Sequence, residues 1–361
     1  MTHPDRRSAH SLVALAREAE QRGDIAKSLG LYDDALALLE DESDLGLLAD
    51  ALRWKGTVHR EQGETEAAYE CYTLSLSYAE RSGSVDSQAH CYNCLAIVAQ
   101  RRGSLNESEH LYKQASELAA TAHDSRLYGA VEHNRGVLMN MQGKFAAAEA
   151  RYVSSLSAFE KANDGQAVSS VLNNLGMLYT KLGHYQRAME TFERGLEIAR
   201  TRQDTLIESI ITLNLADAWV AVGKLDEAEK ACAHLLEGAR TRGDHLTIAG
   251  ALKCRARIER ERGALDASIA TLRTGIFEAE GLEDRLLQAE MLRELGQTSK
   301  ALGNSADARL AWTEAAETFD GVGASHEAAE IMALLATLPG EKDTPERRSP
   351  NPPPEEFRPT A

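Results

Sequence analysis

Apolar and polar positions along this chain repeat with a period of forty residues. In each period, apolar residues fall three and four positions apart in two successive stretches, and one glycine separates the stretches. The clearest copy spans residues 171–200, with its glycine at Gly183. Spacing of three and four places side chains on one face of a helix, so each period predicts two amphipathic helices joined by a turn.

Three residues of each period keep their character in every copy. The glycines are Gly23, Gly63, Gly103, Gly143, Gly183, Gly223, Gly263 and Gly303. Seven residues before them stand the small residues Ala16, Gly56, Ala96, Gly136, Gly176, Ala216, Ala256 and Gly296. Nine residues after them stand the mostly aromatic residues Tyr32, Tyr72, Tyr112, Tyr152, Phe192, Cys232, Leu272 and Trp312. A small residue facing a large one favours close helix packing, so we predict eight helical hairpins.

Polar residues mark where each later repeat begins. Twenty-one residues after the first seven glycines stand side chains suited to accept hydrogen bonds at a helix start, namely Asp44, Ser84, Asp124, Asp164, Asp204, Asp244 and Asp284. The first helix is predicted to span residues 8–22. After the eighth repeat, we predict one capping helix over residues 325–338 with Ser325 as its N-cap.

This pattern divides the chain into three segments. We predict a disordered N-terminus at residues 1–7, a helical solenoid at residues 8–338 and a disordered tail at residues 339–361. The tail holds seven of the eight prolines of the chain together with many charges. Its PNPPPEEF portion has two interpretations, a solvated tail or an SH3-like ligand in the polyproline conformation.

The packing residues of the clearest copy carry a family resemblance. They follow L-x2-L-G-x2-Y and then A-x3-F, filled by Leu172, Leu175, Gly176, Tyr179, Ala188 and Phe192. This pattern resembles the tetratricopeptide repeat (TPR), and the forty-residue period is similar to the LGN/Pins, kinesin light chain and Rap/PlcR-type TPR regions. The resemblance implies an all-α right-handed superhelix whose first helices line a concave, peptide-binding surface.

Composition excludes several other classes of function. The net charge of −16, from 56 acidic and 40 basic residues, predicts repulsion from nucleic acid and anionic membranes. No run approaches the roughly 18 apolar residues of a membrane helix, and the first residues lack an apolar signal region, so we expect a cytoplasmic protein. No glycine-rich phosphate loop, GxSxG or HExxH motif occurs. We therefore expect neither an enzyme nor a cofactor.

The five cysteines are scattered, and only Cys91 and Cys94 form a CxxC pair. A zinc site needs a second pair or histidines at matching spacing. Although His90 is adjacent, Cys94 falls at a repeat position that Trp54 and Asn134 occupy in other copies. We expect small packing residues and no metal site, with a metal or redox role as the alternative.

Asparagines recur on the predicted first helices of the central repeats. Nine residues before the turn glycine stand Asn134, Asn174 and Asn214, and one residue earlier stand Asn93, His133 and Asn173. Helix interiors disfavour asparagine because its side chain competes for backbone hydrogen bonds. We interpret the register as an amide ladder that binds the backbone of an extended peptide. The alternative is hydrogen bonding among these side chains across helix interfaces.

Basic residues gather on the same face near both ends of the chain. The C-terminal set is Lys253, Arg257, Arg260 and Arg293, to which Lys300 adds a further charge. These side chains are predicted to bind peptide carboxylates, unless Glu261 and Glu290 pair with Arg257 and Arg293 on a solvated surface. The N-terminal set is Arg53, Trp54 and Arg60, in which Trp54 is either a peptide anchor or packed between helices.

These features favour one class of function. We predict a non-catalytic adaptor that binds an extended, acidic peptide segment of another protein in its concave groove. The alternative is a regulator whose superhelix changes curvature when a peptide binds. Self-assembly is a third interpretation, and the capping helix restricts it to a closed dimer, so a monomer or closed dimer is expected.

Overall fold

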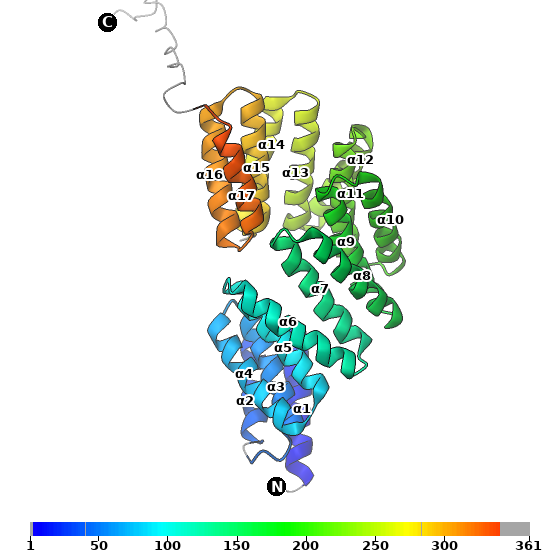
Figure 1. Cartoon of the computed structure of the whole chain (residues 1–361), viewed down its shortest axis with the longest axis vertical. Coiled ribbons are helices and arrows are strands. Elements are labelled where there is room, and N and C mark those ends of the chain that lie inside the picture. Colours follow the sequence, from blue (N-terminus) through cyan, green and yellow to red (C-terminus); the bar gives the residue numbers. More distant parts are fainter. Residues whose placement is uncertain (1–2, 40, 283, 340–361) are drawn as a thin grey trace, which may run out of the picture.

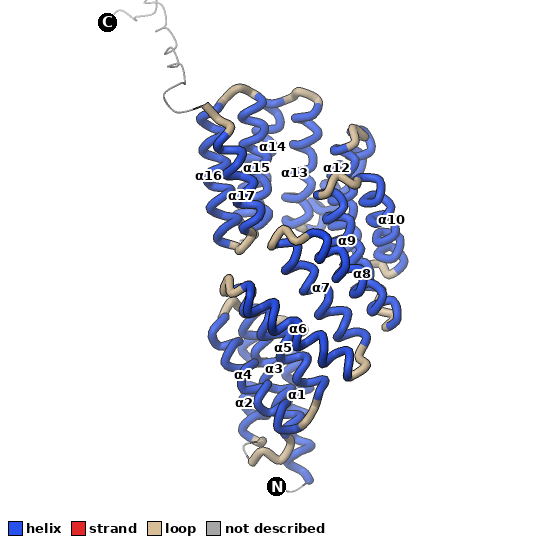
Figure 2. The backbone as a smooth tube through the Cα atoms, viewed as in Figure 1, coloured by secondary structure: helices blue, strands red, loops and turns tan. Residues whose placement is uncertain are grey.

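The computed structural model describes residues 3–39, 41–282 and 284–339, and these residues form seventeen helices without a strand (Figure 2). The first helices of the repeats are α1 His3–Gln21, α3 Leu45–Glu61, α5 Val85–Arg101, α7 Ser125–Met141, α9 Gly165–Lys181, α11 Thr205–Ala221, α13 His245–Glu261 and α15 Arg285–Ala301. The second helices are α2 Ile25–Ala37, α4 Thr65–Ser82, α6 Leu105–Thr121, α8 Phe145–Lys161, α10 Tyr185–Thr201, α12 Leu225–Arg242, α14 Leu265–Gly281 and α16 Ser305–Gly321. With α17 Ser325–Ala336, they form the predicted α-solenoid (Figure 1).

The predicted signals at helix boundaries are confirmed. The side-chain oxygen of each of the seven predicted N-cap residues accepts a backbone N–H of its helix; Asp44 accepts from Leu47 at 3.1 Å and Asp204 from Ile207 at 3.1 Å. All eight turn glycines have a positive φ, from 71° at Gly143 to 82° at Gly303. Residues other than glycine rarely adopt a positive φ, which explains why a glycine stands at this position in every repeat.

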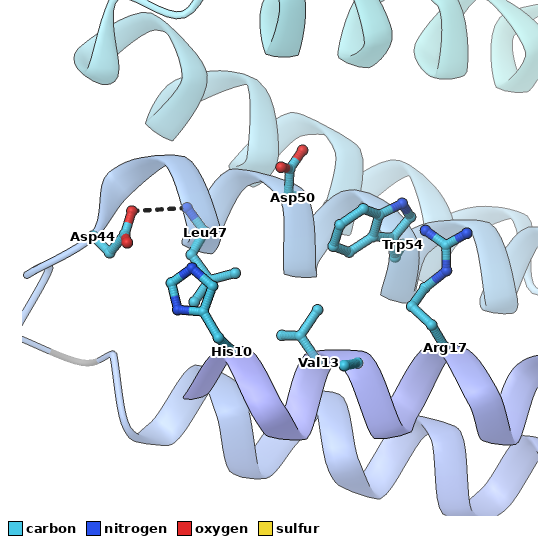
Figure 3. A pocket seen from close by; sticks show the side chains of 8 residues that line it. His10, Val13, Arg17, Asp44, Leu47, Asp50 and Trp54 are labelled. Atoms are coloured by element: carbon cyan, nitrogen blue, oxygen red, sulfur yellow. Dashed lines mark hydrogen bonds between the residues drawn. The ribbon is translucent and has the colours of Figure 1, made fainter. Parts of the chain in front are cut away.

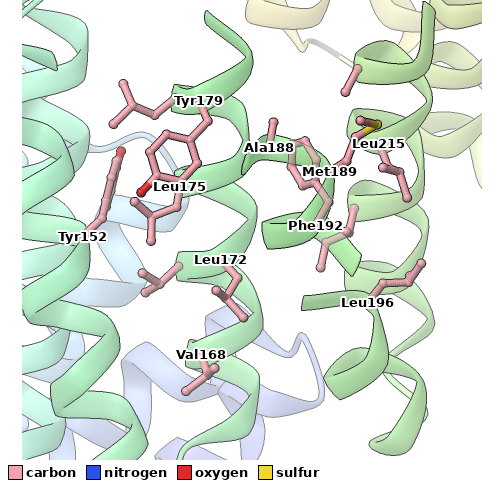
Figure 4. Close-up of a cluster of buried hydrophobic side chains, with 14 of the residues drawn as sticks. Tyr152, Val168, Leu172, Leu175, Tyr179, Ala188, Met189, Phe192, Leu196 and Leu215 are labelled. Carbon is pink, nitrogen blue, oxygen red and sulfur yellow. The ribbon is translucent and has the colours of Figure 1, made fainter. Parts of the chain in front are cut away.

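The predicted contact between small and large residues is also present. A Cβ atom added to Gly176 would lie 2.4 Å from Cε1 of Phe192, and one added to Gly296 would lie 2.3 Å from Cδ1 of Trp312. Each aromatic ring therefore rests directly on the backbone of the first helix. Figure 4 shows Phe192 in the central hydrophobic cluster, which continues from α7 to α11. The core thus grows by repetition along the stack.

The ends of the solenoid differ from the prediction. Helix α1 begins at His3 rather than at Ser8. Pro4 is compatible with this start, since it falls in the first turn, where a missing N–H breaks no helical bond. Residues 3–7 of the segment expected to be disordered are therefore helical. Residues 1–2 and 340–361 lie outside the described residues, and so do the predicted disorder of the tail beyond Pro339 and its two interpretations.

The N-cap predicted for the capping helix is wrong. Ser325 is the first residue of α17, and Ala324 occupies the N-cap position without a side-chain hydrogen bond. The physical reason is the turn before it, in which Gly323 has a φ of 77°. This turn repeats the form found inside the hairpins, where the helix begins two residues after the glycine.

The capping helix also reaches the middle of the solenoid. The rings of Phe145 and His326 meet edge to face at 5.2 Å, and Nζ of Lys181 lies 2.7 Å from Oε1 of Glu327. The stack therefore winds far enough to bring α17 beside α7 and the end of α9 (Figure 1). Among the described residues, no helix combines the length and apolar character needed to cross a membrane.

Candidate functional site

The first helices form the inner layer of the solenoid. Neighbouring first helices contact each other along the stack, whereas comparable contacts do not link the second helices within the described residues. Elements on the inside of a curved stack lie closer together than those on the outside, so the first helices line the concave surface. The residues predicted to bind a ligand all lie on these helices.

Three hydrogen bonds connect the first helices of the central repeats, and we call them the amide rungs. They join Nδ2 of Asn134 to Oδ1 of Asn93 at 3.1 Å, Nδ2 of Asn174 to Nε2 of His133 at 2.6 Å, and Nδ2 of Asn214 to Oδ1 of Asn173 at 2.8 Å. The two residues of each rung are forty-one positions apart in the sequence. The side chains therefore do bond across helix interfaces, as the alternative interpretation predicted.

The rungs are neutral and leave hydrogen-bonding capacity unused. Burial lowers the pKa of His133 to about 4, so its imidazole is uncharged near neutral pH and Nε2 accepts from Asn174. An asparagine offers two N–H donors and one oxygen acceptor, and a rung uses only one donor of the later residue. The side-chain oxygens of Asn134, Asn174 and Asn214 make no hydrogen bond within the described part of the chain. All three residues are partly exposed.

The predicted basic cluster is instead a network of ion pairs. It joins Lys253 to Glu290, Arg257 to Asp217 at 2.7 Å, and Arg260 to Glu294 at 2.5 Å. The pairs expected within single helices, Glu261 with Arg257 and Glu290 with Arg293, are wrong. Glu290 bonds to Lys253 of the preceding repeat, and Glu261 lies 3.4 Å from Arg260. The reason is the stacking, which brings charges of neighbouring first helices closer than charges one helical turn apart.

The pKa shifts of Glu294 and Lys253 favour the charged form of both groups. Burial alone would raise the pKa of Glu294, but the guanidinium groups of Arg257 and Arg260 lower it below its ordinary value. Burial would lower the pKa of Lys253, yet Glu290 and Asp217 raise it. The network is therefore close to neutral overall, and this corrects the prediction of a basic end.

Arg293 differs from the other predicted basic residues. It makes no ion pair with any residue that the structure describes, and its guanidinium carbon lies 5.9 Å from the ring centroid of Phe319. Lys300, in the same part of the solenoid, donates to Oγ1 of Thr337 at 2.9 Å. Of the predicted basic residues at this end, Arg293 and Lys300 are thus the two that make no ion pair among the described residues.

A cavity of about 360 Å³ lies between α1 and α3 at the other end (Figure 3). Trp54 lines it, half-buried, with the guanidinium carbons of Arg17 and Arg53 at 4.6 and 5.1 Å from the centroid of its ring. Arg53 also bonds to Asp50 at 3.0 Å. Trp54 is therefore packed between helices and accessible from the cavity at once. Arg60 lies two turns further along α3, 3.4 Å from Glu61.

The thiols of the CxxC pair are buried in the core. Cys91 lies 3.0 Å from the hydroxyl of Ser75, and burial raises the pKa of its thiol to about 12. Cys94 packs in the cluster around Tyr72. Such surroundings favour the protonated thiol, which is a poor metal ligand and nucleophile.

Comparison with known families identifies the repeat. The sequence model of the tetratricopeptide repeat matches residues 47–121 and 127–201, which hold helices α3 to α10. The chain therefore contains tetratricopeptide repeats in these residues. The remaining hairpins of this TPR protein continue the same glycine register. Comparison with curated proteins finds no match.

Solved structures share the fold of this TPR protein. The apo form of the quorum sensor NprR from B. thuringiensis aligns with a TM-score of 0.67 and 14% identity, over 86% of this chain and 87% of that one. The apo form of RapI aligns with a TM-score of 0.61 and 15% identity, over 76% of this chain and 99% of that one. A Rap protein complexed with competence and sporulation factor aligns with a TM-score of 0.53 and 17% identity, over 82% of this chain and 76% of that one. The predicted similarity to Rap-type proteins is thus confirmed at the level of the fold.

Sequence reasoning missed two of the three acidic residues of the ion-pair network, Asp217 and Glu294. Asp217 stands forty residues before Arg257, and Glu294 falls in the register of Asn134, Asn174 and Asn214. Charges of opposite sign at the same register of neighbouring TPR units were the available signal for the pair of Asp217 with Arg257. The pairs of Glu290 with Lys253 and of Glu294 with Arg260 join residues 37 and 34 positions apart, so the register does not reveal them. The prediction considered neighbours within one helix and overlooked neighbours one repeat apart.

Proposed function

We propose that this TPR protein is a non-catalytic adaptor that binds an extended peptide segment of a partner protein along its central first helices. The observation that supports this most is the set of amide rungs. They hold three asparagines at one register, each with an unused oxygen and N–H at the inner layer.

The spacing of these amides suits a peptide backbone. Packed helices lie about 10 Å apart and an extended chain rises about 3.3 Å per residue, so successive amides meet about every third peptide residue. Each amide matches either the N–H or the C=O of a backbone, whatever the peptide sequence. The rungs restrain the amides before binding, which lowers the entropy cost of holding a ligand.

Charged residues define the ends of the proposed site. Arg293 lies at the C-terminal end, and Trp54 with Arg53 lies beside the cavity at the N-terminal end. We propose that a carboxylate of the peptide meets Arg293, whereas Lys253, Arg257 and Arg260 hold the groove wall through their ion pairs. An acidic residue of the peptide is therefore needed near one end rather than along its whole length.

The test begins with peptides selected from a random displayed library on the purified chain. Their affinity is then measured for the wild type, for the triple variant Asn134→Ala, Asn174→Ala, Asn214→Ala, and for Met177→Glu. At about 0.5 to 1.5 kcal/mol for each amide, the triple variant is expected to bind about 10- to 1000-fold more weakly. Asn106→Ala, an exposed asparagine on the second helix α6, is the matched control and is expected to bind normally.

Met177→Glu separates binding from stability. Met177 is 43% exposed on α9, three residues after Asn174, and its Sδ accepts from Nδ2 of Asn173 at 3.6 Å, a donor that the rungs do not use. Met177→Glu therefore alters the groove face and retains every donor and acceptor of the three rungs. Weaker binding at an unchanged melting temperature supports the groove. Normal binding by both variants, with earlier melting of the triple variant alone, would show that the asparagines serve only the helix interfaces.

One observation favours a second function, that of a peptide-responsive regulator. Contacts of Lys181 with Glu327 and of Phe145 with His326 join α17 to the middle of the solenoid. A peptide that prefers a different curvature would have to break these contacts. Small-angle scattering on the wild type and on Lys181→Glu, with and without a selected peptide, tests this function. An identical radius of gyration in all four samples would exclude it.

A further inference from the structure

Two carboxylates and an imidazole from neighbouring repeats meet beside the amide rungs. Asp86 and His90 lie one turn apart on α5, and Asp124 is the N-cap of α7. One potential ligand atom from each of the three residues lies within 4.8 Å of the others. Nε2 of His90 is 3.8 Å from Oδ2 of Asp86. The predicted adaptor function uses none of these residues.

The next repeat has the same capping carboxylate with a different partner. In the forty-residue register, Asp86 corresponds to Arg126 and Asp124 corresponds to Asp164. Nε of Arg126 lies 2.7 Å from Oδ2 of Asp164, so a guanidinium neutralises the capping carboxylate there. In the third repeat a second carboxylate replaces that guanidinium. Two like charges at this distance repel each other unless a cation lies between them.

The orientation of the carboxylates suits a bound cation. Oδ1 of Asp124 accepts the backbone N–H groups of Arg126 and Leu127 at 2.8 and 2.9 Å, which fixes the carboxylate. Its Oδ2 makes no hydrogen bond within the described residues. The spacing of four between Asp86 and His90 puts both side chains on one helix face. In many metal-binding proteins, hydrogen bonds to a ligating carboxylate, like those from Arg126 and Leu127 to Asp124, hold the ligand in place.

We propose that Asp86, His90 and Asp124 bind a divalent transition-metal ion of the Zn²⁺ or Mn²⁺ type. One imidazole nitrogen and two carboxylate oxygens are ligands that both ions accept, and water completes the coordination. The ion takes the place of the guanidinium of the next repeat and joins α5 to α7. These are the same helices that the rung between Asn93 and Asn134 connects.

Titration calorimetry on the full, tag-free chain after chelator treatment tests this site, with ZnCl₂ and MnCl₂ added in separate experiments. One ion per chain is expected to bind, with a raised melting temperature. Asp86→Asn and His90→Gln are expected to weaken binding at least about tenfold, since each removes a ligand. His110→Gln, which changes an exposed histidine on α6, is the matched control and is expected to bind like the wild type.

Asp86→Arg provides an independent readout. It copies the arrangement of Arg126 and Asp164, so it is expected to abolish metal binding while raising the melting temperature of the metal-free chain. Circular dichroism checks that each variant is folded. No saturable binding of either ion to the wild type, or binding that survives in Asp86→Arg and is lost in Cys91→Ala with Cys94→Ala, would overturn the proposal.

Discussion

The amide rungs and the ion-pair network occupy equivalent positions of the repeat with opposite chemistry. Glu294 stands in the register of Asn214, and Lys253 and Arg293 stand in the register of Asn173. In both regions the side chains connect the first helices of successive repeats. The neutral amides keep spare donors and acceptors, whereas the charged groups use theirs on each other. The same position therefore carries spare hydrogen-bonding capacity in the centre and charges paired with each other at the C-terminal end.

The largest expected effect comes from removing one charge of the network. Glu294 has a side chain only 7% exposed and pairs with Arg260 and Arg257. Glu294→Ala removes the closest counter-charge of Arg260 and leaves Arg257 with Asp217 alone. Removing one partner of a buried ion pair costs up to about 3 to 5 kcal/mol. Urea unfolding measures the loss. Glu261→Ala, whose side chain is 48% exposed, is the control and is expected to cost less than about 1 kcal/mol. Equal costs would mean that water screens the whole network.

A second prediction tests whether the two regions differ only in their polar groups. Gly176→Ala and Gly296→Ala each push a Cβ into an aromatic ring, at 2.4 and 2.3 Å from its nearest atom. Both are expected to destabilise the fold by about 1 to 3 kcal/mol through overpacking. Gly30→Ala, an exposed helical position with nothing within 4 Å, is expected to stabilise it by about 0.5 to 1 kcal/mol. If Gly176→Ala and Gly296→Ala lower the free energy of unfolding by different amounts, the two regions differ in their core packing as well as in their polar groups.

A smaller loss is expected for a single rung. Asn214→Ala removes one neutral hydrogen bond to Asn173 and is expected to cost about 0.5 to 1.5 kcal/mol. Because no charge is involved, raising the salt concentration leaves this cost unchanged, whereas it lowers the cost of Glu294→Ala. Urea unfolding of both variants at low and high NaCl measures the difference. A salt-dependent cost at Asn214 would contradict the assignment of a neutral rung.

The smallest expected effect is a difference between the two regions in how their stability depends on pH. Burial lowers the pKa of His133 from 6.5 to about 4, so its contribution to stability is full above pH 6.5 and is lost as the pH falls toward 4. At pH 6 the loss is expected to stay below about 1 kcal/mol. The pKa values of Glu290 and Glu294 lie below 4.5, since nearby cations outweigh burial, so their contribution is lost only below pH 4.5.

Hydrogen exchange localises this difference. Between pH 6.5 and 4.5, α7 and α9 are expected to lose protection before α13 and α15, after correction for the intrinsic exchange rate. His133→Gln removes the titrating group and serves as the control. Earlier loss of protection in α13 and α15 would reverse the comparison.

The sequence by itself determined the hairpins and their internal packing. Turn glycines, capping residues such as Asp204, and pairs such as Gly176 with Phe192 act over twenty-one residues or fewer. Each is repeated in nearly every copy, so the period separates these signals from chance. The asparagine register was visible for the same reason, and both its interpretations followed from the chemistry of an amide.

Only the tertiary structure decided which side chains of different repeats meet. Asn174 bonds to His133 rather than to a neighbour on its own helix, and Arg257 bonds to Asp217 rather than to Glu261. These partners depend on the offset between stacked hairpins, which no local pattern encodes. The contact between Lys181 and Glu327 depends on the curvature summed over several repeats. A small rotation at each interface accumulates along the stack, so the structure alone brings residues 146 positions apart into contact.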